Sequence, residues 1–184
     1  ISFTGSTGIG KHIMKRGADT VKKVFLELGG KSAHIILDDA DVGFASFMCI
    51  SVCFNAGQGC ALATRMLVPH SLYDQAVETA KSVFESIKLG DPMSRDQIMG
   101  PLANKRQQMR VLEYIEKGKA EGARLVCGGA VPEGLEKGCY VLPTIFADVS
   151  NDMTIAQEEI FGPVLCIIPY DTEEDAIRIA NDSI

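Results

Sequence analysis

Short apolar runs alternate with amphipathic stretches along most of the chain. The segment 74–88 is the clearest helix, because its apolar side chains recur every three or four residues while glutamate and lysine side chains fall between them. Strands are predicted where the apolar runs are short, at 1–4, 24–28, 33–37, 66–70, 124–129, 140–146 and 164–170. Further helices are predicted at 10–17, 42–54, 104–121 and 173–182. Strands that alternate with helices in this way indicate an α/β fold with a largely parallel sheet flanked by helices.

Two local features make this prediction more specific. The predicted helix over 42–54 is apolar on nearly every side, so we expect it to be buried, with Asp39 or Asp41 as its N-cap. Pro143 and Pro169 lie inside predicted strands. Because proline lacks a backbone N–H, both positions are expected at strand ends or on edge strands.

The composition excludes several classes of protein. The chain has 184 residues and a formal net charge of −6, with scattered lysines and arginines, so we expect no nucleic-acid partner. The longest apolar stretch, 42–54, is interrupted by two serines and is shorter than the roughly 18 residues of a membrane span. We therefore expect no membrane insertion. The three histidines stand apart from one another and from the cysteines, which argues against a metal site.

The six cysteines are irregularly spaced, which indicates free thiols and a reducing, cytoplasmic compartment. Cys49 and Cys53 lie four residues apart on the predicted buried helix and are expected to be packing residues. Cys60 differs because it follows the Gly-Gln-Gly triplet 57–59 in a turn. There a thiol is accessible and its backbone N–H can stabilise an oxyanion. From this context alone, Cys60 is either a nucleophile or a structural cysteine.

A glutamate and two loops are the other candidates for chemistry. Glu27 lies in the apolar run FLELGG, where it is either an exposed strand residue or a general base tuned by partial burial. The turn at 2–10, SFTGSTGIG, suits a phosphate but is also compatible with an ordinary strand–turn–helix, and it lacks the GxGxxG pattern. The segment 157–163 places carboxylates before an aromatic ring and a Gly-Pro turn, and by itself it reads as an acidic helix end.

Taken together, these segments form one ordered series. FTGST-x-x-G, LELGGKS, F-N-x-GQ-x-C and EEIFGPV follow one another, with a Gly-Pro pair at 100–101 between the last two. The interval from Glu27 to Cys60 is 33 positions (60 − 27). In order and spacing the chain resembles the aldehyde dehydrogenase family, from Ser2 to Asn181.

The resemblance implies roles for individual residues. Cys60 would be the thiolate that attacks the aldehyde, and Glu27 the base that later activates water. Gly5, Ser6 and the turn to Gly10 would contact the cofactor pyrophosphate, and the Leu28 backbone would lie beside the carboxamide. The remaining contacts with NAD or NADP would come from Glu159 on the nicotinamide ribose, Phe161 near the nicotinamide, and Gln107 with Arg110 on a ribose.

The resemblance also implies the organisation of the protein. The segment 1–28 would be the C-terminal piece of the cofactor-binding domain, and 29–184 an incomplete aldehyde dehydrogenase-like catalytic domain. We expect the chain to be part of a longer, homo-oligomeric protein that acts on a small-molecule aldehyde. In the family an Asn upstream of this chain completes the oxyanion site, so we expect the isolated chain to turn over little.

Two alternatives from other functional classes stay open at this point. A cysteine hydrolase or transferase that needs no nicotinamide would also use an exposed thiol, but it would leave EEIFGPV and FTGST unexplained. A catalytically silent structural protein with the same fold would have no need for Cys60, Glu27 and Glu159 together. Activity with and without added nicotinamide cofactor distinguishes the first alternative from the dehydrogenase.

Overall fold

The computed structural model describes residues 1–183 and divides the chain into two compact units, Ile1–Gly30 and Lys31–Ile184. In the first unit, β1 (Ser2–Gly5) and β2 (Phe25–Leu28) pair in parallel, and α1 (Thr7–Ala18) connects them. The boundary lies close to the one expected at 28/29, while the assignment of the units to cofactor-binding and catalytic domains stays a prediction.

The second unit is built on a five-stranded sheet with the order β3-β4-β7-β6-β5. All neighbouring strands are parallel except β5, which pairs antiparallel with β6. The strands are β3 (Ala33–Ile35), β4 (Arg65–Pro69), β5 (Arg124–Cys127), β6 (Thr144–Ala147) and β7 (Val164–Tyr170). Every residue of β4 and β6 is buried, so these strands and β7 form the centre of the core. The predicted α/β fold with a largely parallel sheet is confirmed.

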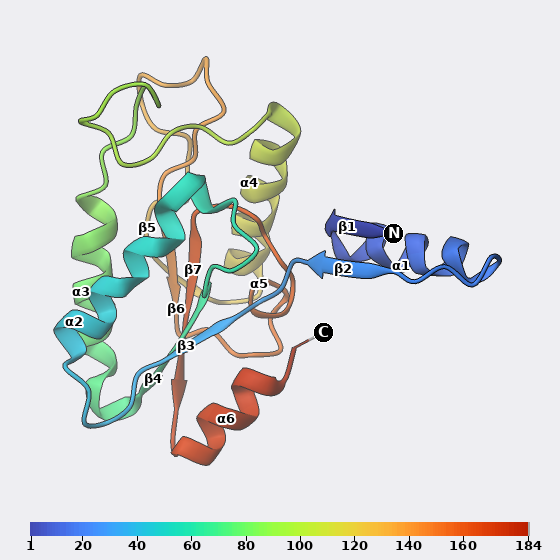
Figure 1. The fold of residues 1–184 in the computed structure, drawn as a ribbon. Helices are drawn as coiled ribbons and strands as arrows, with labels where there is room; N and C mark the ends of the chain where they lie inside the picture. The colour runs from blue at the N-terminus through green and yellow to red at the C-terminus, as the bar shows by residue number, and fades with distance from the viewer. Residues whose placement is uncertain (184) are drawn as a thin grey trace. The chain divides into compact units, whose positions relative to one another are not determined.

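Helices cover the sheet of the second unit. Figure 1 shows α2 and α3 on one side of the strands and α4 with α5 on the other. The helices of the second unit are α2 (Val42–Phe47), η1 (Met48–Gly57, a 3-10 helix), η2 (His70–Leu72, 3-10), α3 (Tyr73–Glu85), α4 (Lys105–Ala120), α5 (Thr154–Gln157) and α6 (Glu173–Asn181). In the described part of the chain, no helix is long and apolar enough to cross a bilayer.

The predicted buried helix over 42–54 is wrong in two respects. Asp41 caps the helix as expected, accepting from the Phe44 N–H at 3.2 Å, but the α-helix ends at Phe47 and continues as η1. The phenyl ring of Phe44 is 66 % exposed, and Phe47 and Phe54 are exposed as well. An all-round apolar pattern does not specify which side faces the core, and here one side packs inward while these rings point outward.

The two prolines of the predicted strands both lie at or near a strand end. Pro143 immediately precedes β6, at a strand end as predicted. Pro169 lies inside β7, a central strand, but beyond the residues that pair with β6 (Val164–Cys166), so it too lies near a strand end as predicted. Pro169 is the second-last residue of the strand, where losing one N–H removes little of the ladder.

Candidate functional site

Cys60 lies at the end of a loop with unusual backbone geometry, the thiol loop (Asn55–Cys60). Asn55 and Ala56 have φ angles of 50° and 55°, and Gly57 follows with φ 74°. Three consecutive left-handed residues end η1 abruptly and turn the chain toward the sheet. The Cys60 side chain at the end of this turn is exposed, and its thiol is free. The expected accessibility of Cys60 is thus met.

Gly57 is the point where the thiol loop contacts another segment, the acidic loop (Glu158–Gly162). A Cβ atom at position 57 would lie 2.0 Å from the Gly162 carbonyl carbon and 2.1 Å from its oxygen. Backbone packs directly on backbone here, which only glycine allows. The structure therefore brings the loop of Cys60 and the loop of Glu159 and Phe161 together within the second unit.

Gln58 holds the thiol loop at two points. Its side-chain nitrogen donates to the Asn55 carbonyl at 2.9 Å, and its side-chain oxygen accepts from the Ala103 N–H at 2.9 Å. Gln58 is not among the site residues predicted from the sequence. Its place between two glycines is the signal that could have identified it, since a polar side chain inside a glycine turn often bonds to the local backbone.

The acidic loop is held by polar side chains from α4. Arg110 donates to the Glu159 carbonyl at 2.7 Å, and the Gln107 side-chain nitrogen donates to the carbonyls of Ile160 (3.1 Å) and Phe161 (2.8 Å). Phe161 has φ 60° and an exposed ring. The structure places Gln107 and Arg110 on the backbone of the loop, and their predicted contacts with a cofactor ribose stay predictions.

A buried lysine lies near the acidic loop and the sheet. The Lys31 side chain is only 5 % exposed. Burial lowers the pKa of its amino group, the Arg65 guanidinium lowers it further, and the Glu159 carboxylate raises it. The Lys31 ammonium and the Glu159 carboxylate are therefore electrostatically coupled.

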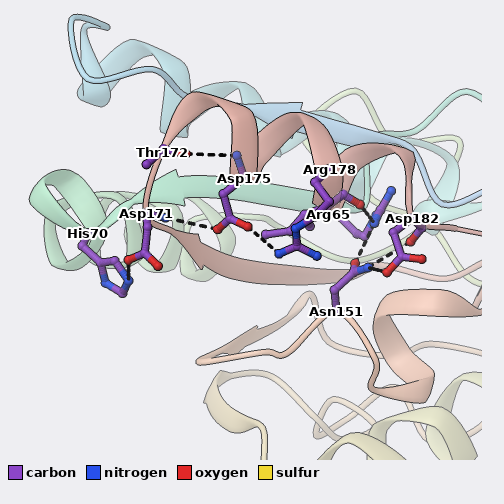
Figure 2. Close-up of polar contacts among 9 residues, drawn as sticks. Arg65, His70, Asn151, Asp171, Thr172, Asp175, Arg178 and Asp182 are labelled. Carbon is purple, nitrogen blue, oxygen red and sulfur yellow. Dashed lines mark hydrogen bonds and ion pairs between the residues drawn. The ribbon is translucent and has the colours of Figure 1, made fainter.

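Arg65 begins β4, five residues after Cys60, and its side chain is almost completely buried. Its guanidinium group donates to the Lys31 carbonyl (2.8 Å), Asn151 Oδ1 (2.7 Å), the Ile179 carbonyl (2.9 Å) and the Ala180 carbonyl (2.9 Å). Figure 2 shows it among the polar groups at the end of α6. Arg65 thus ties the strand that follows the thiol loop to the entry of β3 and to the last turn of α6.

The first unit carries the remaining predicted site residues. Glu27 is exposed on β2, with its neighbours Leu26 and Leu28 half-buried. Ser6 is the N-cap residue of α1, yet its hydroxyl makes no capping hydrogen bond, and the first turn of α1 contains no acidic residue. A Cβ at Gly8 would meet nothing within 4 Å. This open, positively polarised helix start fits a pyrophosphate group.

Gly10 has a packing role in the first unit. A Cβ at this position would lie 2.8 Å from the Leu28 side chain, so glycine lets α1 approach β2 closely. Its predicted contact with the cofactor, like those of Gly5 and Leu28, stays a prediction. Because Glu27 belongs to the first unit and Cys60 to the second, their convergence on one pocket is also still a prediction.

The other cysteines are unlike Cys60. Cys49, Cys53 and Cys166 are buried, as expected for packing residues. Burial raises the pKa of the Cys49 thiol to about 12 and that of Cys127 to about 11, so neither is a thiolate near neutral pH. Among residues 1–183 no group of histidine, cysteine or carboxylate side chains is arranged to hold a metal ion.

Comparison with known proteins identifies relatives along the whole chain. Residues 1–184 match the Aldehyde dehydrogenase family. A putative aldehyde dehydrogenase of Staphylococcus saprophyticus is 50% identical over 185 residues, and a 3-succinoylsemialdehyde-pyridine dehydrogenase of a Pseudomonas species is 51% identical over 185 residues. The chain is covered completely in both cases but spans only 39% of each relative's length.

Solved structures give the same result. A Mycobacterium tuberculosis aldehyde dehydrogenase in complex with NAD+ matches with a TM-score of 0.95 at 54% identity, covering 100% of this chain and 38% of that one. A mutant of aldehyde dehydrogenase C from Pseudomonas syringae, in complex with NAD+ and octanal, matches with a TM-score of 0.98 at 44% identity, again over 100% and 38%. The fold of the chain is therefore that of this part of these enzymes.

Proposed function

The chain belongs to the aldehyde dehydrogenase family, and on that premise we propose that the protein to which it contributes oxidises an aldehyde to a carboxylic acid with NAD or NADP. Cys60 is the nucleophile and Glu27 the general base. Residues 1–28 belong to the cofactor-binding part and the rest to the catalytic part. We further propose that this protein is homo-oligomeric and resides in a reducing, cytoplasmic compartment.

One observation carries this proposal. The exposed thiol of Cys60 ends a loop that is seated, through Gly57, directly on the Gly162 backbone of the loop that carries Glu159 and Phe161. A structural cysteine gains nothing from exposure at the end of a left-handed turn, whereas a nucleophile requires it. The neighbouring loop offers a carboxylate and an exposed ring, which suit a ribose and a nicotinamide.

Each unit carries groups that suit one part of the cofactor. The open N-terminus of α1 with Gly5 and Ser6 suits the pyrophosphate, because its N–H groups and the unused Ser6 hydroxyl can donate to anionic oxygens. Glu159 would accept hydrogen bonds from the ribose hydroxyls, and Phe161 would pack beside the nicotinamide. When bound, the nicotinamide supplies the hydride acceptor of the reaction.

The residues of this chain perform the other steps. The Cys60 sulfur, as thiolate, forms a bond to the aldehyde carbon, and the carbonyl electrons move to oxygen, which the Cys60 N–H stabilises. Loss of hydride from that carbon leaves a thioester on Cys60. Glu27 then takes a proton from water, which attacks the thioester carbon, and the carbon–sulfur bond breaks to release the acid and the thiolate.

The aldehyde is assigned only as a class. The relatives' names include a succinoylsemialdehyde of pyridine and betaine aldehyde, and one solved relative binds octanal. These aldehydes differ in charge, bulk and chain length. The shared chemistry is the carbonyl carbon that a thiolate attacks.

The test uses a chimera in which residues 1–184 replace the matched 39% of the Staphylococcus saprophyticus relative. We expect the chimera to reduce NAD+ or NADP+ when an aldehyde is added, as followed by the absorbance of the reduced nicotinamide. Cys60→Ala should abolish this signal, and Cys139→Ala should keep it, since Cys139 lies outside both loops. Hydrolysis of esters by a chimera that reduces neither NAD+ nor NADP+ with any aldehyde would favour a cysteine hydrolase and overturn the proposal.

A further inference from the structure

The acidic loop has no regular secondary structure, yet four consecutive residues of it are bound by one face of α4. Arg110 and Gln107 donate to the carbonyls of residues 159, 160 and 161. The Tyr114 hydroxyl donates to the Glu158 carboxylate at 2.5 Å. Buried or half-buried carbonyls outside a ladder need such donors. The α4 side chains thus supply the loop carbonyls with the hydrogen-bond donors that a regular strand or helix would provide.

The spacing of the three donor residues matches the helix. Positions 107, 110 and 114 are separated by three and four residues, so their side chains lie on one face of α4. Val111 belongs to the same face, since a Cβ at Gly162 would lie 2.4 Å from a Val111 methyl group. Together the four side chains lie against residues 158–162. We call Gln107, Arg110 and Tyr114 the α4 stripe.

Contacts within the α4 stripe fix its own side chains. Arg110 donates to the Tyr114 hydroxyl at 3.1 Å, and its guanidinium carbon lies 4.7 Å from the centre of the Tyr114 ring. The ammonium group of Lys117 also lies 4.7 Å from the centre of the ring. The Tyr114 ring therefore contacts two cations, and its hydroxyl accepts from Arg110 and donates to Glu158. These contacts leave the tyrosine side chain little rotamer freedom. The stripe is therefore a rigid template for the loop.

We propose that the α4 stripe consists of positioning residues: by binding the backbone of the acidic loop and the Glu158 carboxylate, it sets the place of the Glu159 carboxylate and the Phe161 ring. The proposal rests on the proposed function, in which these two residues hold the nicotinamide ribose and ring. It gives Gln107 and Arg110, whose nitrogens donate to loop carbonyls, a positioning role that is separate from their predicted contacts with the cofactor ribose. Nucleotide affinity should thus depend on a hydrogen-bond network that forms before the nucleotide binds.

The first experiment measures amide hydrogen exchange in the segment 159–164, apart from Pro163, in the 184-residue chain without nucleotide. We expect Gln107→Ala and Tyr114→Phe to accelerate exchange in this segment by about three- to tenfold, as for the loss of single hydrogen bonds. Arg110→Ala should accelerate it more, and Arg110→Lys should restore part of the protection. Exchange of the buried β4 amides should stay unchanged.

Two matched controls separate positioning from general stability. Gln108 is the neighbour of Gln107 on the same helix, but it donates to the Tyr140 carbonyl, and Tyr140 donates to the Gly90 carbonyl. Gln108→Ala and Tyr140→Phe should not accelerate exchange in the segment 159–164 more than they accelerate exchange in the strands of the sheet. Wild-type exchange of this segment in Gln107→Ala and Tyr114→Phe would overturn the proposal, as would equal acceleration by the controls.

The second experiment uses the chimera and measures the Kd for NAD+ separately from the KM for aldehyde. Tyr114→Phe and Gln107→Ala should raise the Kd by about three- to tenfold and leave the aldehyde KM unchanged, whereas Tyr140→Phe should change neither. A direct contact with the nucleotide would raise the Kd with no change in exchange of the nucleotide-free chain. If the unsubstituted chimera is inactive, the proposed function fails, and the exchange experiment alone decides on the stripe.

Discussion

The thiol loop (Asn55–Cys60) keeps its shape through its own residues, chiefly its backbone with the side chain of Gln58, whereas the acidic loop (Glu158–Gly162) keeps its shape through side chains of another element, α4. The first uses three left-handed residues and a glycine that touches another backbone. The second uses donors spaced along one helix face. The difference shows two ways to fix an irregular segment near a site: backbone sterics, which fail abruptly, and side-chain hydrogen bonds, which can be removed one at a time.

The largest effect should come from the backbone contact between the loops. Gly57→Ala places a Cβ inside van der Waals distance of the Gly162 carbonyl and forces alanine into φ 74°, so we expect the free energy of unfolding to fall by about 4 kcal/mol. Chemical denaturation measures this loss.

Gly122 provides the matched control for that substitution. It has φ 93° but open space around the position of a Cβ. Gly122→Ala therefore reports backbone strain alone and should cost about 1 kcal/mol. Equal losses for the two variants would show that the contact with Gly162 contributes nothing.

The next effect concerns Arg65, which begins β4 five residues after the end of the thiol loop. Arg65→Ala leaves the buried carbonyls of Lys31, Ile179 and Ala180 without these donors, so we expect a loss of about 3 kcal/mol in unfolding free energy. The control is Arg124→Ala, which removes an exposed ion pair with Asp148 and should cost at most about 1 kcal/mol. Denaturation midpoints that fall equally for both variants would contradict the anchoring role.

Thiol chemistry tests the exposure of the thiol loop without any cofactor. At pH 8, iodoacetamide should modify Cys60 at least about 100-fold faster than Cys49, because Cys49 is buried and its raised pKa of about 12 keeps it protonated. Labelling of Cys49 and Cys127 in the folded chain should rise only as the pH approaches their raised pKa values. Peptide mass spectrometry over a time course measures each rate. Labelling of Cys49 as fast as Cys60 would refute this difference.

The smallest effect is expected on α2, the helix that precedes η1 and the thiol loop. The Ser46 hydroxyl is buried and has no hydrogen-bond partner. Ser46→Ala should therefore raise the unfolding free energy by about 1 kcal/mol, because it removes an unsatisfied polar group. Ser82→Ala, at an exposed position of α3, should change it by less than about 0.5 kcal/mol. A loss of stability in Ser46→Ala would indicate a hydrogen bond at this hydroxyl.

The periodicity of the sequence predicted most of the elements but not their exposure. The strands and the helices α3, α4 and α6 follow from patterns that have one solution each, such as the apolar face of 74–88. The segment 42–54 is apolar all round, so its pattern could not tell which rings face outward. Pro169 was expected at a strand end or on an edge strand, and it lies next to the end of β7, a strand whose buried, branched residues place it at the centre of the sheet.

The candidate site was predictable where a residue acts through its own chemistry. Cys60 stands out because it directly follows a turn that contains two glycines, and a side chain at the end of such a turn is expected to be exposed, as it is. The role of Tyr114 could not be predicted in this way, because it depends on a contact with Glu158, 44 positions away. Spacing along α4 was the available signal, but it has meaning only once the partner loop is known.

The central claim is that Cys60 forms an acyl intermediate that Glu27 resolves. The most direct measurement is the mass of the Cys60 peptide from the Glu27→Gln chimera, after incubation with octanal and NAD+ and rapid denaturation. The account predicts an octanoyl thioester on Cys60, which accumulates because the base is missing, and only a trace of it when Glu27 is present. An unmodified Cys60 in a variant that still reduces NAD+ would contradict the account, as would an octanoyl group on a different cysteine.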